Sequence, residues 1–154
     1  MDQLDRKLIK ALQDNGRASN AELSRIFGVA PSTLLERLRR LEERGVFKGY
    51  RAIVNPEAVG LMVQGFVFVT LDRHDVNCIE KFEEGIRHLP FIRACYHVTG
   101  RFDYLLHVAA KDLTDLGNLV KQQIAGITGI GKAETFLILS EVKPEVGWMI
   151  DDSE

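Results

Sequence analysis

The sequence lacks the features that would cross-link a small protein or hold it in a membrane. It has only two cysteines, Cys78 and Cys95, and their spacing fits neither CxxC nor a zinc finger, so we expect reduced thiols and no structural zinc site. No apolar run approaches the roughly 18 residues that cross a bilayer, and the charged first residues are unlike a secretory signal. These absences predict a cytoplasmic protein with no membrane partner.

The sequence also lacks the motifs of common enzymes. It contains neither GxSxG nor GxxxxGK[ST], and the glycines of "GITGIG" follow a predicted helix rather than a strand, unlike a dinucleotide-binding loop. Cys95, His97 and His107 could share one face of a hairpin centred near Arg101, but alternation along paired strands produces such neighbours freely. We therefore expect no catalytic residues, no metal site and no cofactor apart from a small effector ligand.

The net charge of the chain is close to zero, but the charged residues are unevenly distributed along the sequence. The formal net charge is −2, yet residues 1–60 carry 11 Lys and Arg against 8 Asp and Glu, whereas residues 61–154 carry 9 against 14. A basic first part and an acidic second part suggest two modules. The alternative is a single unit whose solvated surface carries charge unevenly.

Three helices are predicted in the basic part. Apolar residues at helical spacing place the first over about 2–15, and Ser19 with Glu22 three residues later forms a capping box for a second that Gly28 closes. Pro31 suits the first turn of a third helix over about 31–44, which ends at Gly45. Two helices joined by a short turn containing Gly28 form a helix-turn-helix pattern.

The third helix carries the candidate DNA-binding residues. Six cations lie between the middle of this helix and the segment just beyond it: Arg37, Arg39, Arg40, Arg44, Lys48 and Arg51. With its leucines facing inward, the residues predicted to contact double-stranded DNA are Ser32, Thr33, Glu36, Arg37, Arg40 and Lys48. We expect Arg37 to reach DNA and Arg40 and Lys48 to position the phosphate backbone. Pairing of Glu36 with Arg39 and Arg40 on a solvated face is the alternative.

The acidic part predicts an α+β fold. A strand at 62–72, a helix at 76–89, a hairpin formed by 91–99 and 103–110, a helix at 113–127 and a strand at 132–143 follow in order. The order βαββαβ is that of a ferredoxin-like sheet with helices on one face. The other face of the sheet needs a cover, so we expect a homodimer.

Residues 4–60 are similar to the N-terminal module of the Lrp/AsnC family of transcriptional regulators, whose marks here are "NGR" at 15–17, "AEL" at 21–23, "RLE" at 40–42, "GY" at 49–50 and "NPEAVG" at 55–60. "VTGRFDYLL" at 98–106 matches the family's effector loop, and 128–143 resembles its closing strand. Two departures are Ala30, where the family supplies a Ser or Thr cap, and Thr128, where it has Pro.

The resemblance implies four parts: a winged-helix-like helix-turn-helix domain at 1–45, a linker strand at 46–60, a ferredoxin-like effector-binding and oligomerisation domain at 61–143, and a tail at 144–154. It implies a sequence-specific transcriptional regulator that forms dimers, assembles to octamers and responds to an amino acid. The effector would bind at a subunit junction, around Thr99, Gly100, Arg101, Asp103 and Tyr104. A tight hairpin capped by Asp103 is the alternative for this loop. For the whole chain, the alternative is a metabolite-binding or catalytic ferredoxin-like module without DNA binding.

Overall fold

The computed structural model describes residues 1–151 and divides them into two units. The first unit consists of residues 1–53 together with the C-terminal segment from residue 143; because the sequence predicts that it binds DNA, we call it the DNA-binding unit. The second unit consists of residues 54–142; because the sequence predicts that it binds an effector, we call it the ligand-binding unit. Each unit encloses its own apolar core. No helix within residues 1–151 is long and apolar enough to cross a membrane.

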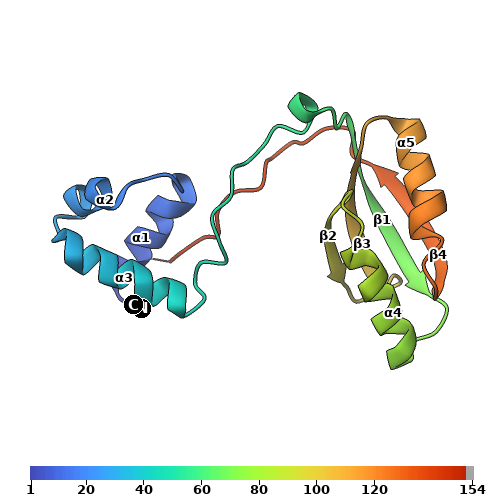
Figure 1. Cartoon of the computed structure of the whole chain (residues 1–154), viewed down its shortest axis with the longest axis horizontal. Helices are drawn as coiled ribbons and strands as arrows, with labels where there is room; N and C mark the ends of the chain where they lie inside the picture. The colour runs from blue at the N-terminus through green and yellow to red at the C-terminus, as the bar shows by residue number, and fades with distance from the viewer. Residues whose placement is uncertain (152–154) are drawn as a thin grey trace. The chain divides into compact units, whose positions relative to one another are not determined.

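The DNA-binding unit is built from three helices: α1 (Gln3–Asp14), α2 (Asn20–Phe27) and α3 (Pro31–Glu43) (Figure 1). They enclose the buried side chains of Leu8, Leu12, Leu23, Leu34 and Leu38. The predicted limits of all three helices are confirmed to within about two residues. The leucine spacing determines these limits, because each helix must turn its apolar face toward the same core.

The ends of these helices are closed by local hydrogen bonds. The Ser19 hydroxyl accepts from the Glu22 N–H at 3.1 Å, which is one of the two bonds of the predicted capping box, and Gly28 ends α2 at φ 64°. A complete capping box lies at α1, where Asp2 and Asp5 each accept from the other's N–H. Ala30 begins α3 without a side-chain cap, so its position supplies no oxygen to the first N–H groups of the helix.

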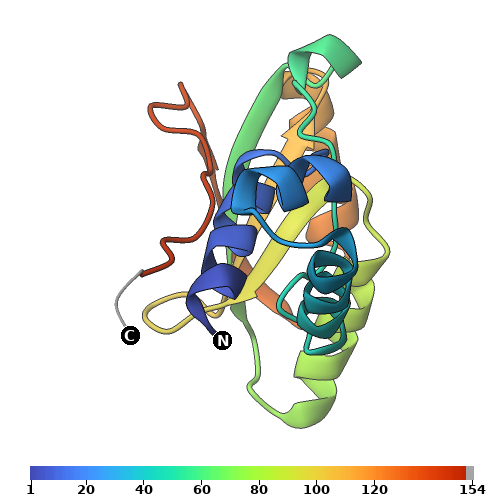
Figure 2. The same cartoon turned by 90° about the vertical axis from the view of Figure 1, so that its left-hand side faces the viewer.

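The ligand-binding unit is an antiparallel sheet of four strands in the order β2-β3-β1-β4, which confirms the βαββαβ fold. The strands are β1 (Val63–Leu71), β2 (Ile92–His97), β3 (Tyr104–Ala110) and β4 (Ile130–Leu137). Helix α4 (Val76–Arg87) and helix α5 (Leu113–Asn118), which continues as a π-helical turn over Leu119–Ile124, lie on one side of the sheet (Figure 2). Their apolar faces form one core with alternate residues of β1 and β3, among them Val67 and Leu106.

Three parts of the ligand-binding unit and its connections differ from the sequence prediction. The predicted linker strand at 46–60 forms no strand, and its end is a 3₁₀ turn, Glu57–Val59. Strand β4 ends at Leu137 rather than 143, because its partner β1 begins at Val63. One further bond, from the Ile138 N–H to the Gln64 carbonyl, extends the pairing beyond Leu137. The helix predicted at 113–127 changes to π geometry after Asn118.

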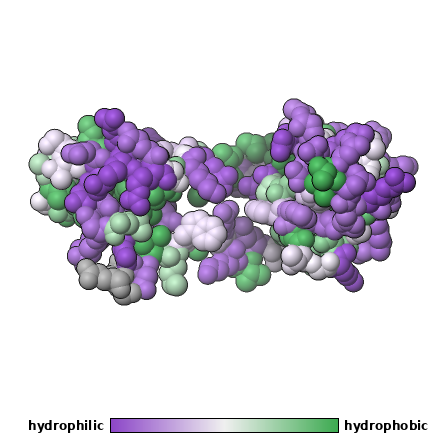
Figure 3. Space-filling view, turned by 90° about the horizontal axis from the view of Figure 1, so that it is seen from below, coloured by the Kyte–Doolittle hydropathy of each residue, from purple (hydrophilic) through white to green (hydrophobic). Residues whose placement is uncertain are grey.

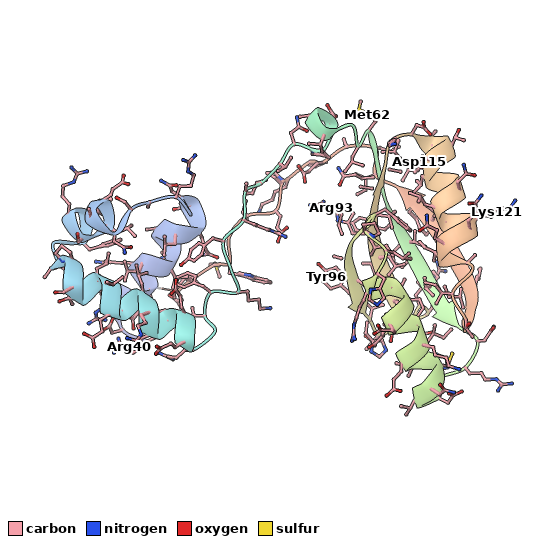
Figure 4. The ribbon with its side chains drawn as sticks, in the orientation of Figure 1. Arg40, Met62, Arg93, Tyr96, Asp115 and Lys121 are labelled. Atoms are coloured by element: carbon pink, nitrogen blue, oxygen red, sulfur yellow. The ribbon has the colours of Figure 1, made fainter. Side chains whose placement is uncertain are left out.

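The face of the sheet opposite the helices carries aromatic side chains. Phe68 contacts Phe102 and Phe136, with ring centroids 4.8 and 5.2 Å away. Tyr96 is 56% exposed and Phe136 is 47% exposed, and Tyr96 extends from β2 to the side away from α5 (Figure 4). Figure 3 shows that hydrophilic residues predominate elsewhere on the visible surface, with hydrophobic patches between them. We call the side of the sheet opposite the helices the open face.

Candidate nucleic-acid interface and ligand-binding loop

Helix α3 presents its polar residues away from the buried leucines. Ser32, Thr33, Glu36 and Arg40 are exposed, as is Lys48 in the segment that follows the helix. Five of the six residues predicted to contact DNA are therefore accessible to a ligand approaching this helix.

Arg37, the sixth predicted residue, is held by α1. Its guanidinium donates to Asp2 and, at 3.0 Å, to Asp5. The side chain of Arg37 is 24% exposed and that of Asp5 is 3% exposed. The bonds to Asp2 and Asp5 raise the pKa of Arg37, and the Asp5 N–H and Arg37 together lower the pKa of Asp2. Arg37 therefore joins α3 to α1 in this structure.

The other arginines of α3 differ in how firmly they are bound. Arg40 lies 3.7 Å from Asp5 but is 52% exposed, so it can turn toward a phosphate. Arg39 pairs with Glu43 at 2.7 Å, whereas the sequence alternative paired Arg39 and Arg40 with Glu36. The Arg39–Glu43 pair neutralises one cation of the helix.

The loop between β2 and β3 contains the residues predicted to bind the effector. Thr99, Gly100 and Arg101 are exposed, and Gly100 has φ 123°. The Arg101 guanidinium lies 4.7 Å from the ring centre of Phe102, which in turn packs on Phe68 of the open face. The exposed tip of this loop therefore lies beside an aromatic surface.

Asp103 fastens this loop to the end of β1. Its carboxylate accepts from the Leu71 N–H at 2.8 Å and lies 2.9 Å from His74 Nε2. Its own N–H donates to the Val69 carbonyl at 2.9 Å. Burial raises the pKa of Asp103, but the Leu71 N–H and His74 outweigh it and the net pKa is lowered. Both carboxylate oxygens are engaged within the unit.

Tyr104 also makes internal contacts. Its side chain is buried against Phe82, its hydroxyl donates to Glu83 at 2.8 Å, and its ring stacks on His97. Burial and the Glu83 carboxylate raise the pKa of Tyr104. Tyr104 therefore lies on the helix-covered face of the sheet.

A second glycine-rich segment meets the effector loop at the end of β1. The Asp72 N–H donates to the Gly129 carbonyl at 2.9 Å, one residue after Leu71 binds Asp103. A side chain at Gly129 would clash with Sγ of Cys78. Leu71 and Asp72 thus connect two segments that lie far apart in the sequence. Their backbone roles leave no side-chain pattern by which sequence reasoning could find them.

The hairpin register separates the three residues considered for a metal site. A bulge between Ile92 and Ala94 places His107 opposite Ala94, and Cys95 opposite Leu106. Cys95 and His97 then lie on the helix-covered face, and His107 lies on the open face. Within residues 1–151, no group of three His, Cys, Asp or Glu side chains could hold a metal ion.

Comparison with known proteins agrees with this architecture. Residues 1–48 match the family described as winged helix-turn-helix DNA-binding, and residues 64–148 match the Lrp/AsnC ligand binding domain. The chain is 36% identical to the leucine-responsive regulatory protein of Escherichia coli K12 over 143 residues, which is 93% of this chain and 87% of that protein. The corresponding protein of Klebsiella pneumoniae is equally similar.

Solved structures show the same fold. A transcriptional regulator from Neisseria meningitidis in complex with L-Met has a TM-score of 0.88 and 33% identity, and the match covers 94% of this chain and 93% of that chain. AsnC of Escherichia coli has a TM-score of 0.86 and 26% identity, and the match covers 95% and 97%.

The helix-turn-helix unit and the ligand-binding unit together define a DNA-binding regulator with an amino-acid-responsive domain. The chain belongs to the Lrp/AsnC family of transcriptional regulators. Members of this family are DNA-binding regulators rather than enzymes, so the alternative of a metabolite-binding or catalytic ferredoxin-like module without DNA binding is wrong.

Proposed function

We propose that the chain regulates transcription as a homodimer whose two α3 helices bind neighbouring half-sites of an operator. The exposed polar surface of α3 carries this proposal, because Ser32, Thr33 and Glu36 lie at its N-terminal half, where such helices reach base edges. Arg40 and Lys48 contact the phosphate backbone. Arg37 holds α3 in position through Asp2 and Asp5.

The open face of the sheet is the proposed dimer interface. It exposes Tyr96 and Phe136 beside Phe68 and Phe102, and a second copy of the same face would cover these rings. Aromatic side chains of this kind dominate the energy of protein interfaces. Assembly of such dimers to octamers stays a prediction from the family resemblance.

The proposed effector is an amino acid with an apolar side chain. Two relatives point to this class, one named for its response to leucine and one solved with L-Met. We assign Thr99, Gly100 and Arg101 to direct contact with the effector, because they are exposed and can offer N–H and cationic donors to a carboxylate. We assign Asp103 and Tyr104 to positioning the loop, because their polar atoms are bound within the unit.

Calorimetry with L-leucine and L-methionine tests this assignment. Gly100→Ala forces a side chain into a backbone with φ 123°, so we expect a loss of affinity of about tenfold or more for whichever amino acid binds the wild type. Gly117→Ala is the matched control, because Gly117 lies in α5 and a Cβ there meets open space. Equal affinity of the wild type and the folded Gly100→Ala variant would place the site elsewhere.

A further inference from the structure

The C-terminal segment packs on the first helix of the DNA-binding unit. The Gln13 carboxamide bonds both backbone groups of Trp148: its Oε1 accepts from the Trp148 N–H at 2.6 Å, and its Nε2 donates to the Trp148 carbonyl at 3.0 Å. One helical side chain therefore binds the extended segment as a neighbouring strand would.

A second contact lies further along the same helix. The Arg6 guanidinium donates to the Asp151 carbonyl at 2.8 Å. Gln13 and Arg6 lie two helical turns apart on α1, and Trp148 and Asp151 lie three residues apart. The segment thus follows the surface of α1 and is not fixed at a single point.

Gly147 permits the close approach. A Cβ at this position would lie 2.9 Å from Cδ of Gln13 and 3.0 Å from its Cβ, closer than ordinary contacts allow. All of these bonds go to the backbone of the segment, and the side chain of Trp148 stays 85% exposed. Recognition therefore depends on the glycine and the extended backbone, and it leaves the indole free.

The chain contributes two separate segments to the DNA-binding unit. The chain leaves the DNA-binding unit after residue 53, forms the ligand-binding unit, and returns at residue 143. We propose that the surface of α1 formed by Arg6 and Gln13 is a docking site for residues 145–151 of the same chain, so that the DNA-binding unit is joined to the ligand-binding unit by two connections. This attachment goes beyond DNA and effector binding and does not depend on either.

The intact chain offers a direct probe, because Trp148 is the only tryptophan of the sequence. We expect Gln13→Ala to increase the nanosecond component of the Trp148 anisotropy decay and to speed exchange of the amides at 145–151 by about 10- to 30-fold, because both hydrogen bonds to Trp148 are lost. Gln3→Ala, the same substitution on the same helix, should leave both unchanged.

Gly147→Ala provides an independent variant outside any helix or strand. Its added Cβ should displace the segment from Gln13 and reproduce the faster exchange, whereas Gly117→Ala should not. Unchanged anisotropy and exchange in both Gln13→Ala and Gly147→Ala would overturn the docking proposal.

A mixed dimer distinguishes docking within one chain from docking onto a partner. One chain carries Gln13→Ala and keeps Trp148, and the other keeps Gln13 and carries Trp148→Phe. The proposal predicts that the single Trp148 stays mobile in the mixed dimer, because its own chain lacks Gln13. Recovery of the wild-type anisotropy would contradict the attachment within one chain.

Discussion

The Nη1 atom of Arg37 lies 3.0 Å from Oδ1 of Asp5, and the Asp5 side chain is almost completely buried. A buried carboxylate is stable only when a cation or several donors compensate for its lost hydration. Arg37 supplies that compensation and at the same time fixes the rotation of α3 relative to α1. The orientation of the exposed DNA-binding residues therefore depends on a pair that itself faces inward.

Removing Arg37 should destabilise the DNA-binding unit. We expect Arg37→Ala to lower the free energy of unfolding by about 2–3 kcal/mol, because Asp5 is left buried without its nearest cation. Arg39→Ala is the control: its pair with Glu43 is mostly exposed, so its loss should cost less than about 1 kcal/mol. Urea unfolding of the two variants measures both values, and equal stabilities would show that the Arg37 pair contributes nothing.

Arg40 and Lys48 should act on DNA through charge alone. Each substitution to alanine is expected to weaken binding to all sequences alike and to reduce the salt dependence of log K by about one unit. Arg37→Ala should leave that salt dependence unchanged, because Arg37 is bound to carboxylates in the folded unit. Lys121→Ala, in the ligand-binding unit, is the control for a general loss of positive charge. A slope that falls for Arg37 and not for Arg40 would reverse the assigned roles.

Asp103 should make the ligand-binding unit sensitive to acid. Its pKa is lowered in the folded state, so its stabilising effect is fully present above the ordinary Asp pKa of about 3.9 and is lost as pH falls through the lower folded value. Asp103→Asn should therefore cost about 1–2 kcal/mol at pH 7 and progressively less below pH 4. Denaturant unfolding across this range tests the trend, and a constant difference at every pH would contradict it.

The open face should be required for dimerisation. Phe68→Asp places a carboxylate between Phe102 and Phe136 and is expected to yield monomers in sedimentation experiments. Val76→Asp is the control, since Val76 is 70% exposed at the first turn of α4, away from the open face. A folded Phe68→Asp variant that stays dimeric would exclude this face as the interface.

Cys95 should react slowly although it is solvent-accessible. Burial of its thiol and the nearby Glu83 carboxylate raise the pKa of Cys95 to about 11. At pH 8 the thiolate fraction is then on the order of 100-fold below that of an ordinary cysteine with a pKa of about 8.5. Peptide mapping after iodoacetamide treatment measures the rate. A rate equal to that of a free cysteine would show that the thiol is not shielded.

Sequence patterns predict the parts of this fold that depend on local periodicity. The leucines of the DNA-binding unit and the alternating apolar residues of β1 and β3 locate their elements because burial requires period 3.6 or period 2. The Ser19 cap was predictable for the same local reason. The candidate DNA-binding residues on α3 were predictable because they occupy the positions that the buried leucines leave.

The missed features depend on residues far apart in the sequence. Asp5 is separated from Arg37 by 32 positions, Leu71 from Asp103 by 32, and Gln13 from Trp148 by 135. Periodicity carries no information on such pairs. In each pair, a side chain that could otherwise contact a ligand or a neighbouring chain instead holds two segments of the same chain together.

The most direct test is binding of the intact chain to the DNA upstream of its own gene, measured with and without each of the twenty amino acids. We predict salt-dependent binding and at least one apolar amino acid that changes the Kd by about fivefold or more, the range of ordinary coupling between two sites. The same amino acid should raise the melting temperature, because it binds only the folded ligand-binding unit. Absence of DNA binding, or DNA binding that no amino acid alters, would contradict an amino-acid-responsive regulator.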